Sequence, residues 1–336
     1  MTIVKSEFAL ALNQVATERG ISPDEVIASI EAAVLAAYKK EYPEKMETVL
    51  TAKVSKENGE TRIFVDKKDI TPAGFGRIAA QTAKQVIIQK IREAEKKTVI
   101  AHYRSLLGTL VKGRIIRYDG YNAHVDIGKA EAILPKEEQV RNEDYQVNSS
   151  FTFYIKEISE DKFGSSRIIV SRAEPRLIAE LFKREVPEIA NGTVEIKKVV
   201  REPGERAKIA VYSTQGGVDP VGACVGQKGV RVQTVTDEFD QKEKIDVIQW
   251  NNDVKLFLSA ALAPAKISLV TIDADQKRAV VTVEESQAPL AIGKSGVNVN
   301  LAAKLVEMEI DIKQVPNPNP SPSSSNSATS QTKTTN

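Results

Sequence analysis

Two short glycine motifs are the residues in this 336-residue sequence with the clearest chemical use. In each motif two glycines flank two other residues, and apolar positions at helical spacing stand on both sides. The motifs are Gly226, Gln227, Lys228 and Gly229, and Gly293, Lys294, Ser295 and Gly296. Glycine has no side chain to hold a ligand away, and the helix that follows presents backbone N–H groups at its positive end. The pattern predicts a clamp for the backbone of single-stranded nucleic acid.

The surroundings of the two motifs match position by position. The matched apolar residues are Val221, Cys224 and Val225 with Ala288, Ala291 and Ile292 before the motifs, and Val230, Val232 and Val235 with Val297, Val299 and Ala302 after them. One such motif alone more often marks an ordinary turn. Here both stand within the same order of helix, two strands, helix, loop, helix and strand. This order resembles a type II KH domain in two tandem copies, which implies binding of about four nucleotides of single-stranded RNA or DNA.

Cations near the motifs are candidates for phosphate contacts. Lys228 and Lys294 occupy neighbouring loop positions, and Arg231 follows the first loop. The alternative for each is an ordinary solvated side chain. Because the net charge is only +2, a nucleic-acid partner must be held by locally placed cations and backbone amides, not by a globally positive surface.

Residues 107–173 have a different pattern, with short β runs separated by turn residues. The runs are 111–118, 123–127, 130–134, 151–158 and 167–171. They predict a five-stranded barrel of the OB type. Tyr118, Tyr121 and His124 bracket the first turn, where such barrels present stacking residues to bases. Alternatively, the tyrosines cap the barrel core and His124 is a half-buried neighbour on an alternating strand.

Residues 1–106 predict an α/β domain. Apolar spacing over 6–38 indicates a helical hairpin, and Asn58 with Gly59 indicates a tight turn between strands at 47–55 and 61–66. A long helix over 77–107 carries lysines on one side, at positions 84, 90, 96 and 97. That side is either a docking surface or merely a solvated face.

Composition excludes several classes of protein. Hydrophobic residues make up 41% and charged residues 27%, which is typical of a soluble globular chain, and no apolar run is long enough for a membrane span. The N-terminus lacks the apolar core of a secretory signal, so we expect a cytoplasmic protein. The single cysteine, Cys224, excludes an intrachain disulfide and is expected to be a small core residue. Neither histidine has neighbours that suggest a catalytic triad or metal site, so we expect no enzyme activity, metal or cofactor.

Three sequence runs, together with the order of domains, resemble the NusA family of transcription elongation and termination factors. The runs are ITPAGFGR at 70–77, EVPEI at 185–189 and DPVGACVGQKGVRVQ at 219–233. The barrel resembles the S1 RNA-binding domain. The resemblance implies that the N-terminal domain binds RNA polymerase core beside the RNA exit channel, at the flap of the β subunit. Phe75, Arg77 and Lys84 are the expected polymerase contacts.

The same resemblance implies a monomeric factor that binds nascent single-stranded RNA. It would promote pausing and termination at RNA hairpins or, with other Nus factors, antitermination. The second loop departs from the family pattern, because Ser295, Val297 and Asn300 stand where the family often carries Arg, Gln and Arg. This departure argues against strong RNA binding by the second KH copy.

The sequence thus predicts a multidomain α+β protein. The expected parts are 1–106, an N-terminal polymerase-binding domain; 107–173, an S1-type OB barrel; 174–250 and 251–315, the two KH domains; and 316–336, a disordered tail rich in Pro, Ser, Asn and Thr. The alternative function is an accessory KH and S1 protein of RNA processing or ribosome assembly. Processing enzymes of the polynucleotide phosphorylase type place KH before the barrel and need a large catalytic core, and a ribosomal role does not explain the N-terminal domain.

Overall fold

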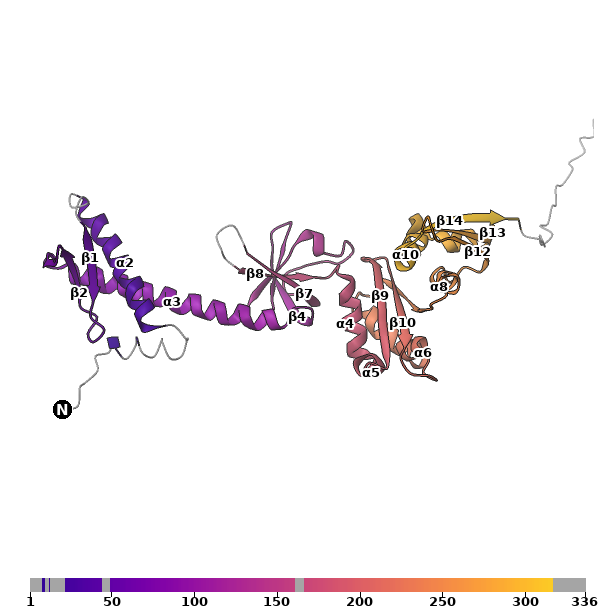
Figure 1. The fold of residues 1–336 in the computed structure, drawn as a ribbon, viewed down its shortest axis with the longest axis horizontal. Coiled ribbons are helices and arrows are strands. Elements are labelled where there is room, and N and C mark those ends of the chain that lie inside the picture. Colours follow the sequence, from indigo (N-terminus) through magenta and orange to yellow (C-terminus); the bar gives the residue numbers. More distant parts are fainter. Residues whose placement is uncertain (1–7, 10–11, 13–21, 44–48, 161–165, 317–336) are drawn as a thin grey trace, which may run out of the picture. The chain divides into compact units, whose positions relative to one another are not determined.

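The computed structural model describes residues 8–9, 12, 22–43, 49–160 and 166–316. The chain, drawn as a ribbon in Figure 1, separates into two compact units, residues 1–106 and 107–336. Each unit has hydrophobic packing of its own. The start of the predicted helical hairpin, residues 6–21, and the predicted disordered tail lie mainly outside the described residues.

Within the described residues of the N-terminal unit, helices α2 and α3 pack against a three-stranded antiparallel sheet in the order β1-β2-β3. The elements are α2 (Pro23–Glu41), β1 (Leu50–Val54), β2 (Thr61–Val65), β3 (Lys68–Asp69) and α3 (Phe75–Ser105). The predicted hairpin is confirmed: Val54 pairs with Thr61, and Gly59 has a φ of +73° in the turn between them. The long helix is confirmed too, and its first half supplies buried residues to the core.

Phe75 opens α3 and belongs to that core. Its side chain is 1% exposed, and its ring lies edge-on to Tyr38 with 5.3 Å between the centroids. Burying a phenylalanine side chain stabilises a fold by about 1.5–3 kcal/mol. A buried ring offers no surface to a partner, so this burial counts against the predicted polymerase contact of Phe75. Its role is to hold α3 against α2.

The second unit begins with a closed five-stranded barrel, in the order β4-β5-β6-β8-β7. Its strands are β4 (Leu110–Tyr118), β5 (Ala123–Asp126), β6 (Glu131–Leu134), β7 (Ser150–Glu160) and β8 (Ser166–Ser171). β4 pairs with both β5 and β7, which closes the sheet. A Cβ at Gly113 of β4 would lie 2.5 Å from Val125 Cγ1 of the neighbouring strand β5, so the close packing at this position requires glycine. The predicted barrel is confirmed.

Two KH copies follow with the same topology. The first comprises α4 (Pro175–Glu185), α5 (Pro187–Ala190), β9 (Val194–Glu202), β10 (Arg206–Ser213), α6 (Pro220–Val225), α7 (Val230–Asp237) and β11 (Lys244–Gln249). The second comprises α8 (Val254–Ala261), β12 (Ile267–Asp273), β13 (Arg278–Glu284), α9 (Ala288–Ile292), α10 (Val297–Val306) and β14 (Glu309–Val315). In each sheet the middle strand pairs antiparallel with the first strand and parallel with the last. The predicted internal duplication is confirmed.

The two KH copies share one hydrophobic core. Ala210 and Ile248, on one face of the first sheet, belong to the same buried cluster as Leu258, Ala279 and Leu301 of the second copy. Helix α10 contacts both β9 and β10 of the first copy. Because apolar burial at this junction is continuous, the two copies are held as one body.

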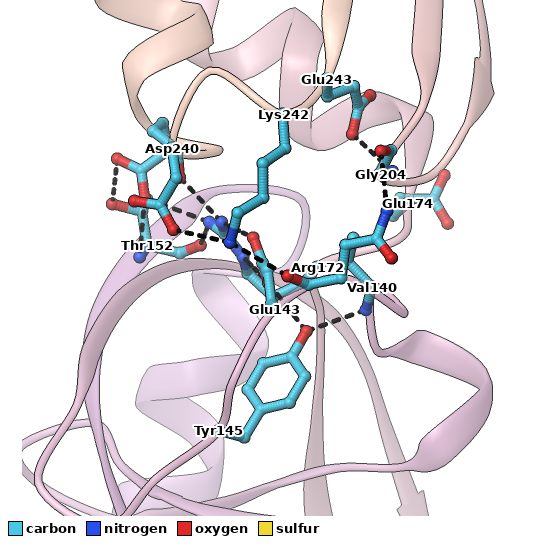
Figure 2. A network of polar contacts seen from close by, with 12 residues as sticks. Val140, Glu143, Tyr145, Thr152, Arg172, Glu174, Gly204, Asp240, Lys242 and Glu243 are labelled. Atoms are coloured by element: carbon cyan, nitrogen blue, oxygen red, sulfur yellow. Dashed lines mark hydrogen bonds and ion pairs between the residues drawn. The ribbon is translucent and has the colours of Figure 1, made fainter.

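A buried ion network joins the barrel to the first KH copy. Arg172 follows β8 and its side chain is fully buried; Figure 2 shows it among Glu143, Thr152 and Tyr145. Its guanidinium donates to both Glu143 carboxylate oxygens, to the Thr152 carbonyl at 2.7 Å and to Glu238 Oε1 at 3.1 Å. Glu238 belongs to the KH copy, and it also accepts the backbone N–H and the hydroxyl of Thr152. The contacts of Arg172 with three different residues require a planar cation with several donors.

A second arginine completes the junction. Arg201, on β9, donates to both oxygens of the fully buried Glu243, at 2.6 and 2.8 Å, and to the carbonyl of Arg172 at 2.6 Å. The Phe239 ring contacts both guanidinium groups, with centroid distances of 4.9 Å to Arg172 and 4.6 Å to Arg201. Burial acts to lower the pKa of Arg172, but the hydrogen bond and charge of Glu143 outweigh it and raise the pKa. The guanidinium is therefore held in its charged form.

We predict that Arg172→Met destabilises the fragment 107–316 by about 3–5 kcal/mol, because it leaves the carboxylates of Glu143 and Glu238 without their cation. Urea unfolding followed by circular dichroism measures the change. Arg176→Met is the matched control: that side chain is 77% exposed, so its loss should leave the free energy of unfolding nearly unchanged. A loss below about 1 kcal/mol for Arg172→Met would show that the network does not hold the junction.

Candidate nucleic-acid interface

The two glycine loops have the same backbone conformation. The first glycine of each, Gly226 or Gly293, has φ and ψ near 75° and 175°, and the third residue, Lys228 or Ser295, has a φ of 52°. A Cβ at Gly226 would lie 2.8 Å from Arg231 Cγ, so the chain passes too close for a side chain. The middle residues of both loops are exposed. The same loop conformation therefore occurs twice in the structure, and both loops are accessible to a ligand.

Helices α7 and α10 begin directly at the end of these loops. Their N-cap residues are Gly229 and Gly296, and neither provides a side-chain oxygen to cap the first turn. N–H groups at a helix start that lacks a side-chain cap are suited to an anion such as phosphate. Exposed Lys228 and Lys294 add a cation beside each helix start. Their phosphate contacts stay a prediction.

The fifth residue after the first glycine fastens each loop, but it differs between the copies. In the first copy, Arg231 donates from one guanidinium nitrogen to the Ala223 carbonyl at 2.6 Å and to Glu188 at 2.9 Å. In the second, the buried Asn298 amide donates to the Leu290 carbonyl at 3.1 Å. Both carbonyls stand three residues before the first glycine. Arg231 is thus a positioning residue of the loop, a role that sequence reasoning missed when it assigned Arg231 to RNA alone.

A cavity of about 480 Å³ adjoins the first loop. Its lining includes Gly226, Gln227 and Arg231 of the loop region, Glu188 of α5 and Val230. Val230 was expected on the apolar face, but its side chain is 62% exposed, whereas the matched Val297 is half-buried. An exposed apolar side chain beside a guanidinium that is paired with a carboxylate suits a nucleotide base. Glu188 was missed as a lining residue, although it stands in the run 185–189.

The second loop has different neighbours. A cavity of about 520 Å³ lies beside it, lined by the three departing residues, Ser295, Val297 and Asn300. The first KH copy contributes two carboxylates to the same lining, Glu202 and Glu205, against one cation from α10, Lys304. Carboxylates repel the phosphates of an RNA strand. The structure thus adds a second physical reason to expect weak RNA binding by this copy.

The three predicted barrel residues lie near one another but are not equally accessible. Tyr118 and Tyr121 are 44% and 50% exposed, so their rings are available to bases. The hydroxyl of Tyr121 donates to Glu137, and this hydrogen bond raises the pKa of Tyr121. The side chain of His124 is 12% exposed and its Nδ1 lies 2.6 Å from Glu131. That burial fits the half-buried alternative for His124 better than a stacking role.

Two of the three residues predicted to contact polymerase are accessible. Arg77 and Lys84 are exposed on α3. They stand two helical turns apart and therefore share a face. With Phe75 buried, a docking surface on this helix rests on these two cations.

Other kinds of site receive little support in the part of the chain that the structure describes. No group of three or more His, Cys, Asp or Glu side chains there is arranged to hold a metal ion. No helix within the described ranges has the length and hydropathy needed to cross a membrane. Cys224 is fully buried, and burial together with the charge of Glu188 raises the pKa of its thiol to about 12. It is a core residue, as the sequence indicated.

Comparison with known proteins identifies the family. The matching family models are the NusA N-terminal domain (7–73 and 65–97), the S1 RNA binding domain (107–172), the NusA-like first KH domain (172–250) and the NusA-like second KH domain (254–319). The chain is 40% identical to the transcription termination/antitermination protein NusA of Halalkalibacterium halodurans, over 92% of this chain and 88% of that protein. It is 38% identical to NusA of Bacillus subtilis and 34% to that of Thermus thermophilus, covering 91% and 90% of those proteins and 92% of this chain in both cases. The chain belongs to the NusA family.

Within this NusA-family chain, the two KH loops are alike in backbone but unlike in surroundings. The first loop combines an exposed lysine, an adjoining cavity and an exposed apolar residue. The second combines an exposed lysine with an adjoining cavity that is lined by two carboxylates, those of Glu202 and Glu205. The barrel adds two accessible tyrosines. The first KH copy and the barrel are therefore the strongest candidates for an RNA-binding surface.

We predict that Gln227→Asp with Lys228→Asp weakens binding of single-stranded RNA about tenfold or more, because added carboxylates repel the phosphates that the first loop would clamp. The matched variant, Lys294→Asp with Ser295→Asp, changes the charge of the second loop by the same amount and should weaken binding less. Fluorescence anisotropy with labelled RNA at one fixed salt concentration measures both. All four positions are exposed, so folding should be kept, whereas replacing Gly226 would strain the loop. Wild-type affinity in the first variant would refute the loop assignment.

Proposed function

We propose that this chain is a non-enzymatic transcription factor that binds RNA polymerase and nascent RNA together, and so modulates pausing, termination and antitermination. The observation that carries the proposal is the pair of glycine loops with matching backbone angles, each at the start of a helix. Each loop lies within the residues that match a NusA-like KH domain model. Single-stranded RNA is the ligand class that such loops bind. The names of the relatives, transcription termination/antitermination proteins, supply the process.

The proposed division of labour follows the modules. The N-terminal unit, 1–106, would bind polymerase core at the flap of the β subunit through the exposed face of α3 that carries Arg77 and Lys84. The barrel, 107–173, and the first KH copy, 174–250, would bind the emerging RNA strand. The second KH copy, 251–315, would contribute a weaker contact. We further propose that the factor acts as a monomer in the cytoplasm, together with other Nus factors.

The polymerase assignment is tested by a pull-down of cognate RNA polymerase core with the fragments 1–106 and 107–316, which have separate hydrophobic cores. We expect the N-terminal fragment to retain polymerase. In the full chain, Arg77→Glu with Lys84→Glu should weaken retention about tenfold or more, because it reverses two charges on one face of α3.

Lys67→Glu with Lys68→Glu is the matched control, since both lysines are exposed. Lys67 lies in the turn before β3, and Lys68 is the first residue of β3. This variant should retain polymerase. Failure of the N-terminal fragment to bind, while the second fragment still binds RNA, would leave a general RNA-binding protein and refute the transcription role.

A further inference from the structure

A cluster of two aromatic rings and a lysine lies on the first KH copy. Tyr212 belongs to β10 and Trp250 directly follows β11. Val211 and Gln249 are paired in parallel register, so the residues that follow them lie side by side. The two rings meet edge to face, with 5.4 Å between their centroids. The ammonium of Lys197, on β9, lies 5.1 Å from the Tyr212 centroid and 5.8 Å from the Trp250 centroid.

The cluster is accessible and adjoins a cavity. The Tyr212 side chain is 38% exposed, and Trp250 is half-buried at the rim of the core shared by the two KH copies. A cavity of about 310 Å³ opens beside Trp250, and its polar lining consists of Lys197, Lys198, Asn251, Asn252 and the carboxylate of Glu307, which is paired with Lys198. A cavity of this volume lies at the small end of the range for ligand sites. Trp250, two cations and two amides therefore line one small space, and Tyr212 adjoins it through its contact with Trp250.

This space is distinct from the two glycine loops. Leu305 and Val306, at the end of α10, line it, whereas the second loop precedes the first residue of that helix. The helix has ten residues, which corresponds to about 15 Å along its axis. The cavity at the first loop is lined by other residues altogether.

We propose that Lys197, Tyr212 and Trp250 form a third contact for single-stranded RNA, at which one base stacks on the aromatic pair. This inference rests on the proposed RNA-binding function and adds a site to it. Every base has a π-face, and stacking on an aromatic side chain is stronger than an exposed cation–π contact. A base can therefore displace the Lys197 ammonium from the rings.

The surrounding charges fit an RNA strand better than a peptide. Lys197 and Lys198 are paired with Glu195 and Glu307, whose side chains are 47% and 75% exposed. Exposed ion pairs contribute little, so both ammonium groups can exchange a carboxylate for a phosphate. The amides of Asn251 and Asn252 offer donors and acceptors to a base edge. A proline-rich peptide would use the rings but not the two cations.

Trp250 is the only tryptophan of the chain, so its emission reports on this site. A short single-stranded oligoribonucleotide titrated into the full chain should quench it. Tyr212→Ser and Lys197→Glu should each weaken the affinity measured by quenching about tenfold, whereas Tyr212→Phe should keep it. Quenching should persist in the variant Gln227→Asp with Lys228→Asp. Lys255→Glu reverses a charge at an exposed position outside the cavity and should change little.

Anisotropy of the same labelled RNA, measured in parallel, separates the outcomes. RNA binding without quenching, unaffected by Tyr212→Ser, would overturn the third contact and leave the proposed function intact. Absence of any RNA binding by the wild-type chain would overturn the proposed function itself. Quenching by a proline-rich peptide but not by RNA would assign the cluster to a protein partner and overturn the inference. Equal losses of RNA affinity in Lys197→Glu and Lys255→Glu would show general electrostatic attraction in place of a specific contact, and would overturn the inference.

Discussion

The buried guanidinium of Arg172 is the interaction on which the arrangement of the RNA-binding unit depends. It lies between carboxylates from two modules, Glu143 of the barrel and Glu238 of the first KH copy. A buried charge is costly unless every donor finds an acceptor, so this side chain permits one relative placement of the modules and penalises the others. Planar bidentate pairing adds directional preference that apolar packing alone lacks. The junction therefore fixes geometry as well as contributing stability.

The junction between the two KH copies works differently. Here the sheet of the first copy and helix α10 of the second bury a continuous apolar surface. Burial of this kind contributes free energy in proportion to area but carries little orientational information by itself. Together the two junctions place the barrel tyrosines, the glycine loops and the Tyr212 cluster on one body. An RNA strand that binds one site is then presented to the next at a raised effective concentration, so several weak contacts can give firm binding.

The sequence predicted the elements well and the roles of individual side chains less well. The glycine loops, the hairpin at Gly59 and the five barrel strands depend on local spacing and turn chemistry, and the structure has them where expected. The burial of Phe75 was not evident from sequence, because a residue in a family-like run can be there for packing as readily as for contact. The positioning role of Arg231 could not be predicted from sequence, because the Glu188 carboxylate and the Ala223 carbonyl that accept its hydrogen bonds approach it only in the folded chain. Tyr212 and Trp250 stand far apart in sequence, and only the parallel pairing of β10 with β11 brings them together.

Whether the barrel and the first KH copy form one rigid body is measured by the distance distribution between two spin labels. Cysteines replacing Lys129 in the barrel and Lys183 on α4 would carry the labels. The native Cys224 would not compete, because its thiol is fully buried and burial raises its pKa to about 12. If the Arg172 network holds the two modules in one placement, the distribution is single and narrow, and it broadens when Arg172→Met is added. A broad distribution with Arg172 in place would contradict this role of the network.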